Sequence, residues 1–299
     1  MKLEGLFLPV TSPFDEASGE LDRAAFEENL GAWVGAGADG IVVAGSTGEA
    51  PLLDEIEILR LVEWARAACP PEVAVVAGTG AESTRQTSRL TREAARAGAE
   101  AVLVRPPSYY APAMSEEALA AHYGAVADDS PTPIILYHIP KFVPVGLAPD
   151  VVGRLVRHEN IVGIKDSSGD VKNLGALVEA CGDRASVLVG AGTLLYGALE
   201  VGAVGGVVAV GLLATRPCAE LLAAWRDGDT ARAGALQDRI GPLHRAVVGK
   251  RGVPGVKAGL DALGLRGGPP RLPLLPADDA ARASVRGALS AAGLQPVPA

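Results

Sequence analysis

The chain has 299 residues, of which 48% are hydrophobic and 21% are charged, and its formal net charge is −8. This length and composition allow a large buried core that needs neither disulfide bonds nor a structural metal. The acidic balance, with no basic stripe that carries aromatic residues, argues against a nucleic-acid partner, and no apolar stretch reaches the ~20 residues that span a bilayer, so we expect no membrane partner either.

The first residues, 1–6, lack the pattern of a signal peptide, so we expect a cytoplasmic location. Short apolar runs then alternate with longer segments of helical periodicity, which is typical of βα units around a parallel sheet. The expected strands are residues 5–10, 40–44, 73–77, 101–105, 133–137, 161–165, 186–189 and 204–208. The expected helices are residues 22–35, 54–68, 82–97, 115–127, 149–156, 170–180, 194–201 and 216–226.

Eight strands that are each followed by a helix predict a (β/α)8 TIM barrel, a fold that usually takes about 250 residues. The first loop, residues 11–14, carries no GxGxxG fingerprint, which disfavours a doubly wound dinucleotide-binding sheet. We expect the catalytic barrel to occupy residues 1–226 and a C-terminal helical extension, packed on the barrel, to occupy residues 227–299. Glycine and proline predict breaks in that extension at 241–242, 252–255 and 267–276.

Lys165 ends the sixth expected strand, in the sequence Ile-Val-Gly-Ile-Lys-Asp-Ser-Ser-Gly. Burial at a strand end disfavours the ammonium form, and a neutral amine can attack a carbonyl carbon to form a Schiff base. An isolated lysine at such a position more often extends its side chain to solvent. Lys165 is therefore a candidate covalent catalyst whose neighbours decide between the two interpretations.

Two further polar features fall on the same face of the predicted barrel, where active sites of this fold lie. Tyr137 ends the fifth strand, next to Lys165, and could exchange a proton beside an imine-forming amine. Ser46 and Thr47, in the loop 45–49 after the second strand, could bind a small carboxylate. Taken alone, Tyr137 could be an aromatic residue of the core, and the loop 45–49 could be an ordinary turn without a binding role. We expect Glu49 to be a structural or capping carboxylate and not a base.

Tyr109 and Tyr110 follow the fourth strand in a loop bracketed by prolines, in a chain with only 4% aromatic residues. They could form a contact surface, or they could pack against the next helix. The three cysteines and four histidines show no metal-ligand spacing, so we expect no metal and no zinc site.

At these residues the sequence resembles the dihydrodipicolinate synthase and N-acetylneuraminate lyase family of class I aldolases, over nearly its whole length. Residues 5–14 resemble the family's first strand, and residues 45–49 resemble its GTTGE or GSNGE loop. Residues 137–140 are similar to the YNxP segment, and residues 164–167 to the Schiff-base segment GxKDS. These motifs stand in the family's order and spacing.

The resemblance implies that Lys165 forms an imine with pyruvate or another 2-oxo acid and that Tyr137 shuttles a proton. It implies that Thr47 links Tyr137 to a tyrosine of a neighbouring subunit, for which Tyr109 is the better match. The resemblance also implies a homo-oligomer, a tetramer as in the family, and no metal or organic cofactor. The substrate-binding residues that it implies are Ser46, Thr47, Ser167 and Gly190.

The substrate is less uniform within the family. Dihydrodipicolinate synthases carry an arginine shortly after the YNxP segment, where this chain has Phe142. Lys141, one residue earlier, could substitute as a cation but does not reproduce a bidentate guanidinium. Residues 78–84, 166–171 and 252–257 resemble the 4-hydroxy-2-oxoglutarate aldolase branch more closely. The main hypothesis is therefore retro-aldol cleavage of a hydroxylated 2-oxo acid, and the alternative is condensation of pyruvate with aspartate semialdehyde by a 4-hydroxy-tetrahydrodipicolinate synthase.

Two other classes of protein stay open. A catalytically silent member could bind a 2-oxo acid as a sensor or serve only as an assembly subunit. A phosphate-binding barrel enzyme is a third option, suggested by Gly205 and Gly206, but no basic residue accompanies these glycines.

Overall fold

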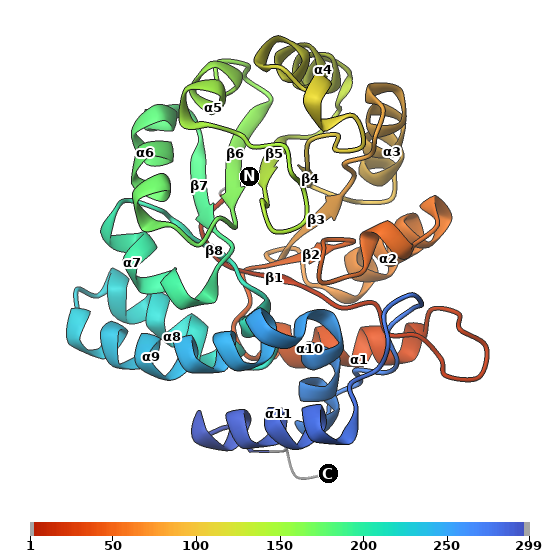
Figure 1. The fold of residues 1–299 in the computed structure, drawn as a ribbon, viewed down its shortest axis with the longest axis vertical. Coiled ribbons are helices and arrows are strands. Elements are labelled where there is room, and N and C mark those ends of the chain that lie inside the picture. Colours follow the sequence, from red (N-terminus) through yellow and green to blue (C-terminus); the bar gives the residue numbers. More distant parts are fainter. Residues whose placement is uncertain (1–2, 296–299) are drawn as a thin grey trace.

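The computed structural model describes residues 3–295 and shows eight parallel strands closed into a barrel, in the order β1 to β8. Helices surround the barrel, so the predicted (β/α)8 TIM barrel is confirmed (Figure 1). The expected outer limits of the two units, residues 1–2 and 296–299, lie outside the described residues. Among residues 3–295, no helix is long and apolar enough to cross a membrane.

The strands are short and almost entirely buried, as expected for a parallel sheet covered on its outer face by helices. Each strand pairs with its sequence neighbour, and β1 also pairs with β8 to close the barrel. Their bounds lie within two residues of the predicted ones. They are β1 (Gly5–Pro9), β2 (Gly40–Val43), β3 (Ala74–Gly78), β4 (Ala101–Val104), β5 (Ile134–His138), β6 (Ile161–Asp166), β7 (Ser186–Val189) and β8 (Gly205–Val207).

The helices around the barrel begin at local signals. The side chains of Asp22, Ser83, Ser115 and Asp170 each accept a hydrogen bond from a backbone N–H in the first turn that follows. Asp54 and Glu57 form a reciprocal capping box. The helices are α1 (Arg23–Gly35), α2 (Glu55–Ala68), α3 (Thr84–Arg96), α4 (Glu116–Asp129), α5 (Pro149–Leu155), α6 (Val171–Cys181), α7 (Leu195–Glu200) and α8 (Thr215–Arg226).

The C-terminal segment adds α9 (Thr230–Leu243), a π-helical turn (His244–Gly249), α10 (Lys250–Ala262) and α11 (Asp279–Ala291). Helix α9 packs against α8, and α11 packs against α10, so the blue helices of Figure 1 lie along the side of the barrel that α1 and α8 cover. Their treatment as an extension distinct from the barrel stays a prediction.

The predicted break at residues 241–242 is wrong. Pro242 lies inside the last turn of α9, and the chain continues directly into the π-helical turn. Leu243 and Val247 are almost fully buried, and their packing holds the helix together where proline alone would disfavour it. A kink does occur at Gly252, whose φ of 58° departs from helical geometry, and residues 267–276 are not helical, as predicted.

Candidate active site

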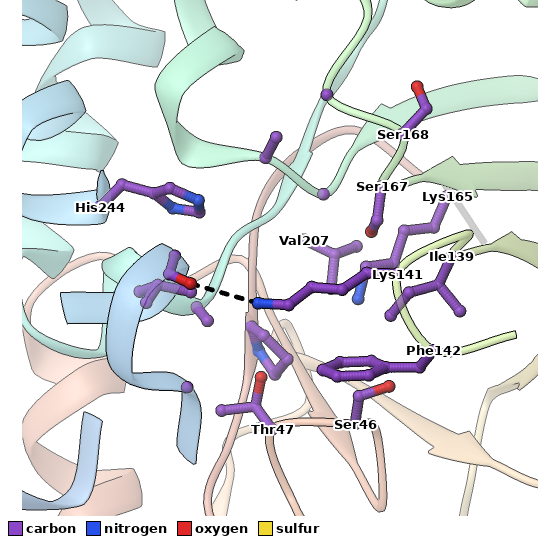
Figure 2. Close-up of a pocket in the computed structure, with 18 of the residues that line it drawn as sticks. Ser46, Thr47, Ile139, Lys141, Phe142, Lys165, Ser167, Ser168, Val207 and His244 are labelled. Atoms are coloured by element: carbon purple, nitrogen blue, oxygen red, sulfur yellow. Dashed lines mark hydrogen bonds between the residues drawn. The ribbon is translucent and has the colours of Figure 1, made fainter. Parts of the chain in front are cut away.

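A cavity of about 580 Å³ opens at the carboxyl ends of the strands, over β5, β6 and β7 (Figure 2). Its walls come from the barrel loops on one side and from the π-helical turn and α10 on the other. Six of the seven predicted site residues line it: Ser46, Thr47, Tyr137, Lys165, Ser167 and Gly190.

Lys165 and Tyr137 are paired directly across β5 and β6. The Lys165 ammonium nitrogen lies 4.2 Å from the centre of the Tyr137 ring. Both side chains point into the barrel mouth and are 4% and 5% exposed, so Lys165 does not extend freely into solvent. The cation–π contact holds the amine beside the phenol in a largely water-excluded position. An amine and a phenol in this arrangement can share a proton during reaction at a carbonyl carbon.

The loop after β2 places a hydroxyl against Tyr137, but that hydroxyl belongs to Ser46. Ser46 Oγ lies 3.4 Å from the Tyr137 hydroxyl. The resemblance assigned this link to Thr47, and no hydrogen bond between Thr47 and Tyr137 is present among residues 3–295. Consecutive loop residues point their side chains in different directions, and only the folded loop decides which of the two hydroxyls faces β5. Thr47 nevertheless lines the cavity.

The turn that carries these hydroxyls is tight. Ala44 and Glu49 have φ values of 51° and 59°, a left-handed conformation that few non-glycine residues adopt. A Cβ atom at Gly78, on the neighbouring strand β3, would lie 2.0 Å from the Ala44 carbonyl oxygen. Only glycine allows the loop to pass this close to β3.

Glu49 is a structural carboxylate, as the sequence led us to expect. Its side chain is buried and forms an ion pair with Lys257 of α10, with 2.6 Å between Lys257 Nζ and Glu49 Oε1. The backbone N–H of Arg271 donates to its other oxygen at 2.8 Å. Burial lowers the pKa of Lys257, and the Glu49 carboxylate opposes that effect only in part. Sequence reasoning missed Lys257, because its partner comes from a distant part of the chain.

Ser167 and Gly190 lie side by side at the ends of β6 and β7. A Cβ atom on Gly190 would lie 1.9 Å from Ser167 Oγ, so the absence of a side chain at Gly190 makes room for that hydroxyl. The Gly190 N–H donates to the Asp166 carbonyl at 2.7 Å and keeps the two strand ends together. The geometry therefore gives Gly190 a spacing role beside the hydroxyl of Ser167.

His138 and Asp166 form a second pair, one residue beyond Tyr137 and Lys165. Because side chains alternate along a strand, this pair lies on the outer face of the barrel. His138 Nε2 is 3.8 Å from Asp166 Oδ1, and His138 Nδ1 accepts a hydrogen bond from the Leu147 N–H. Burial raises the pKa of Asp166 and lowers that of His138. The pair therefore connects the ends of β5 and β6 on the outer face of the barrel.

The structure does not bring Tyr109 and Tyr110 into this cavity. Their side chains are 80% and 72% exposed, and their rings contact each other edge to face at 5.0 Å. The side chain of Glu82 fixes the loop that carries these tyrosines, because it accepts hydrogen bonds from the N–H groups of Ser108 and Tyr109 at 2.8 Å. Burial alone would raise the pKa of Glu82, but these donors and Arg105 hold it at about 2.

Three further residues line the cavity: sequence reasoning missed His244 and Arg245, and it considered Lys141 only as a substitute for the family's arginine. His244 and Arg245 belong to the π-helical turn, and Lys141 belongs to the loop after β5. Figure 2 shows Lys141 reaching across the cavity to the Gly249 carbonyl, to which its ammonium donates at 3.3 Å. Phe142, at the position of the family's arginine, also lines the cavity and is 60% exposed. Only the fold brings the π-helical turn to the barrel mouth.

Comparisons with known proteins agree with this geometry. A model of the dihydrodipicolinate synthetase family matches residues 2–292. The chain is 38% identical over 287 residues to the 4-hydroxy-tetrahydrodipicolinate synthase of Methanothrix thermoacetophila, with 96% of each protein covered. It is 36% identical over 290 residues to the enzyme of that name from Rhodopseudomonas palustris, with 97% of each covered.

Solved structures match the whole chain as well. The crystal structure of the chloride-inhibited dihydrodipicolinate synthase from Acinetobacter baumannii, complexed with pyruvate, superposes with a TM-score of 0.93 at 32% sequence identity. The match covers 98% of this chain and 100% of that one. The shared fold is therefore accompanied by shared sequence along its full length.

Proposed function

This chain belongs to the dihydrodipicolinate synthetase family and is a class I aldolase of the lyase class, and on that basis we propose that Lys165 forms a Schiff base with pyruvate. The observation that carries the proposal is the placement of the Lys165 amine 4.2 Å from the Tyr137 ring inside a shared cavity. Pyruvate bound to a solved relative supports the choice of 2-oxo acid.

In the proposed reaction, the neutral Lys165 amine attacks the C2 carbonyl carbon of pyruvate and forms a C–N bond. Protons pass to the carbonyl oxygen, water leaves, and an imine remains. Tyr137 supplies and removes these protons, and Ser46 is its hydrogen-bond partner. Ser46, Thr47 and the backbone of their loop would hold the pyruvate carboxylate, while Ser167 would contact the substrate beside the imine.

The imine then acts as an electron sink. Loss of a proton from C3 gives an enamine, whose C3 attacks an aldehyde carbon to form a C–C bond. In the reverse direction, the C3–C4 bond of a 4-hydroxy-2-oxo acid breaks and its electron pair moves to the imine, while the 4-hydroxyl loses its proton and becomes a carbonyl. The enamine that remains takes up a proton at C3, and hydrolysis of the restored imine then releases pyruvate. Both directions use the same groups.

The aldehyde partner has two candidates. The names of the relatives favour condensation of pyruvate with aspartate semialdehyde, as a 4-hydroxy-tetrahydrodipicolinate synthase, so the comparisons support the alternative of the sequence analysis better than its main hypothesis. One residue favours the main hypothesis, cleavage of 4-hydroxy-2-oxoglutarate to pyruvate and glyoxylate. Phe142 cannot bind a carboxylate as the arginine of the synthases would.

Borohydride reduction in the presence of pyruvate tests the Schiff base. We expect a stable adduct on the peptide that contains Lys165, and no adduct in Lys165→Ala. Lys172→Ala, which changes an exposed lysine outside the cavity, is the control and should be modified as wild type is. Modification at Lys141, or no modification, contradicts the proposal.

Direct assays with aspartate semialdehyde and with 4-hydroxy-2-oxoglutarate separate the two candidates. Efficient condensation identifies a synthase, and efficient cleavage identifies an aldolase. Pyruvate capture without turnover of either substrate would favour the silent 2-oxo acid-binding protein.

We also propose that the protein is a homo-oligomer, and a tetramer, in which Tyr109 approaches the active site of a neighbouring subunit. The exposure of both tyrosines and their absence from the lining of the cavity in their own chain support this proposal.

A further inference from the structure

The active-site cavity is cationic, although the chain as a whole is acidic. Three charged residues line it, Lys141, Lys165 and Arg245, and no carboxylate from residues 3–295 does. The chain carries 35 acidic and 27 basic residues, so an all-cation lining runs against its composition. Lys165 is assigned to the imine, which leaves two cations without a role in the proposed chemistry.

We propose that Lys141, Arg245 and His244 form a second anion-binding subsite, which takes the distal carboxylate of a 2-oxo dicarboxylate whose C2 is bound to Lys165. This inference rests on the proposed Schiff-base function and specifies its substrate class. The first carboxylate would lie at Ser46 and Thr47, and the second at the wall formed by the π-helical turn.

Lys141 is positioned for this role without being neutralised. Its ammonium donates to the Gly249 carbonyl at 3.3 Å and lies 5.5 Å from the centre of the Phe142 ring. Both contacts orient the charge over the cavity, and neither partner is an anion. The ammonium therefore keeps donors for a ligand. Arg245 likewise forms no salt bridge with a carboxylate of the described chain, and its exposed side chain stands at the cavity rim.

His244 adds an uncharged hydrogen-bonding group. Its ring points into the cavity from the side opposite Lys165 in Figure 2. Its Nδ1 atom is buried and has no hydrogen-bond partner among the described residues, which is costly for a polar atom. Burial, together with Lys141 and Arg245, lowers the pKa of His244 to about 4, so the ring is neutral at pH 7. Nδ1 packs against Gly192, where a Cβ atom would lie 3.0 Å away, so a bound carboxylate would accept a hydrogen bond from the other ring nitrogen, Nε2.

The lining also discriminates against a cationic substrate group. Aspartate semialdehyde carries an ammonium group beside its carboxylate, and that ammonium group would enter a cavity that holds cations and no carboxylate of the described chain. The ammonium group would be repelled by the cations of the lining, and this repulsion is stronger where water is excluded. A 2-oxo dicarboxylate brings only negative groups. The subsite therefore favours cleavage of a hydroxylated 2-oxo dicarboxylate over condensation with an amino aldehyde.

Competing capture of two matched ligands tests the subsite. 2-Oxoglutarate and 2-oxopentanoate have the same carbon chain and the same reactive carbonyl, and differ by the distal carboxylate. We expect half-maximal borohydride capture of wild-type protein at a roughly tenfold lower concentration of 2-oxoglutarate, the effect of one charge-assisted contact. The double variant Lys141→Gln/Arg245→Gln should lose this preference, while its capture of pyruvate changes far less.

Three further measurements complete the test. Lys250→Gln removes an exposed cation that does not line the cavity and should keep the preference for 2-oxoglutarate. His244→Asn, which retains a donor, should keep more of the preference than His244→Leu. Equal capture of the two ligands by wild-type protein, or an unchanged preference in the double variant, overturns the subsite. Absence of pyruvate capture at Lys165 instead overturns the proposed function on which the subsite rests.

Discussion

Lys257 Nζ lies 2.6 Å from Glu49 Oε1, and the two side chains are 1% and 2% exposed. The ammonium also donates to the carbonyls of Ser12 and Pro269 at 2.8 Å each. One buried cation thus connects α10, the first barrel loop and the turn that carries Ser46. The C-terminal helices therefore help to shape the loop that carries Ser46 and Thr47 as well as cover the barrel.

Breaking this ion pair should destabilise the protein strongly. We expect Lys257→Met to lower the free energy of unfolding by roughly 3–5 kcal/mol, because it leaves the Glu49 carboxylate buried without its counter-charge. Urea denaturation at pH 7 measures the loss. Lys250→Met, at an exposed position, is the control, and the double variant Glu49→Gln/Lys257→Met should lose less than the sum of the two single changes. A loss below about 1 kcal/mol would mean that the pair does not hold the loop.

The proton path can be tested one hydroxyl at a time. We expect Tyr137→Phe to lower turnover by about 10²-fold or more, which is typical of a lost general acid–base group. Ser46→Ala should lower turnover more than Thr47→Val, because Ser46 Oγ faces the Tyr137 hydroxyl. Steady-state kinetics with pyruvate as the varied substrate separate turnover from binding. If Thr47→Val lowers turnover more than Ser46→Ala does, the result would contradict this expectation and support the role of Thr47 that the family resemblance implies.

Glu82 should make the stability of the tyrosine loop depend on pH. Its folded-state pKa of about 2 lies below its usual value of 4.5, so its stabilising effect is complete above pH 4.5 and is lost as the pH falls towards 2. Wild-type protein should therefore lose more stability over that range than Glu82→Gln does. Acid titration followed by thermal unfolding measures the difference, and Glu63→Gln, at an exposed position, should behave as wild type does.

The exposed tyrosines should mark a contact between subunits. We expect Tyr110→Glu to weaken association and turnover together, because a carboxylate would be buried in an apolar contact. Tyr109→Phe should lower turnover and leave the assembly intact if its hydroxyl completes a proton path across the interface. Sedimentation velocity at assay concentration measures the assembly. A fully active monomer would limit both tyrosines to packing within their own loop.

The strands, the helices around the barrel and the place of Lys165 at a buried strand end could all be predicted from the sequence, because each depends on local information. Apolar runs such as Ile161–Asp166 mark buried strands, and side chains such as Asp22 mark helix starts within one turn. The parallel order of the strands then places Lys165 next to Tyr137, since consecutive βα units are neighbours in a barrel.

Local information was insufficient at other positions, and there the tertiary structure decided. Pro242 predicts a helix end, yet the burial of Leu243 and Val247 keeps the helix continuous and brings His244 to the barrel mouth. Whether Ser46 or Thr47 faces Tyr137 depends on the left-handed turn at Ala44 and its close contact with β3.

The sequence by itself determined the barrel and the pairing of Lys165 with Tyr137, because periodicity and strand-end residues act over a few positions. The tertiary structure alone decided which charges share the cavity and which are cancelled. Lys257 is neutralised by Glu49, whereas Lys141 and Arg245 meet no carboxylate of the described chain at the cavity. The net charge of the cavity depends on side chains that come from distant segments of the chain, so local sequence patterns cannot predict it.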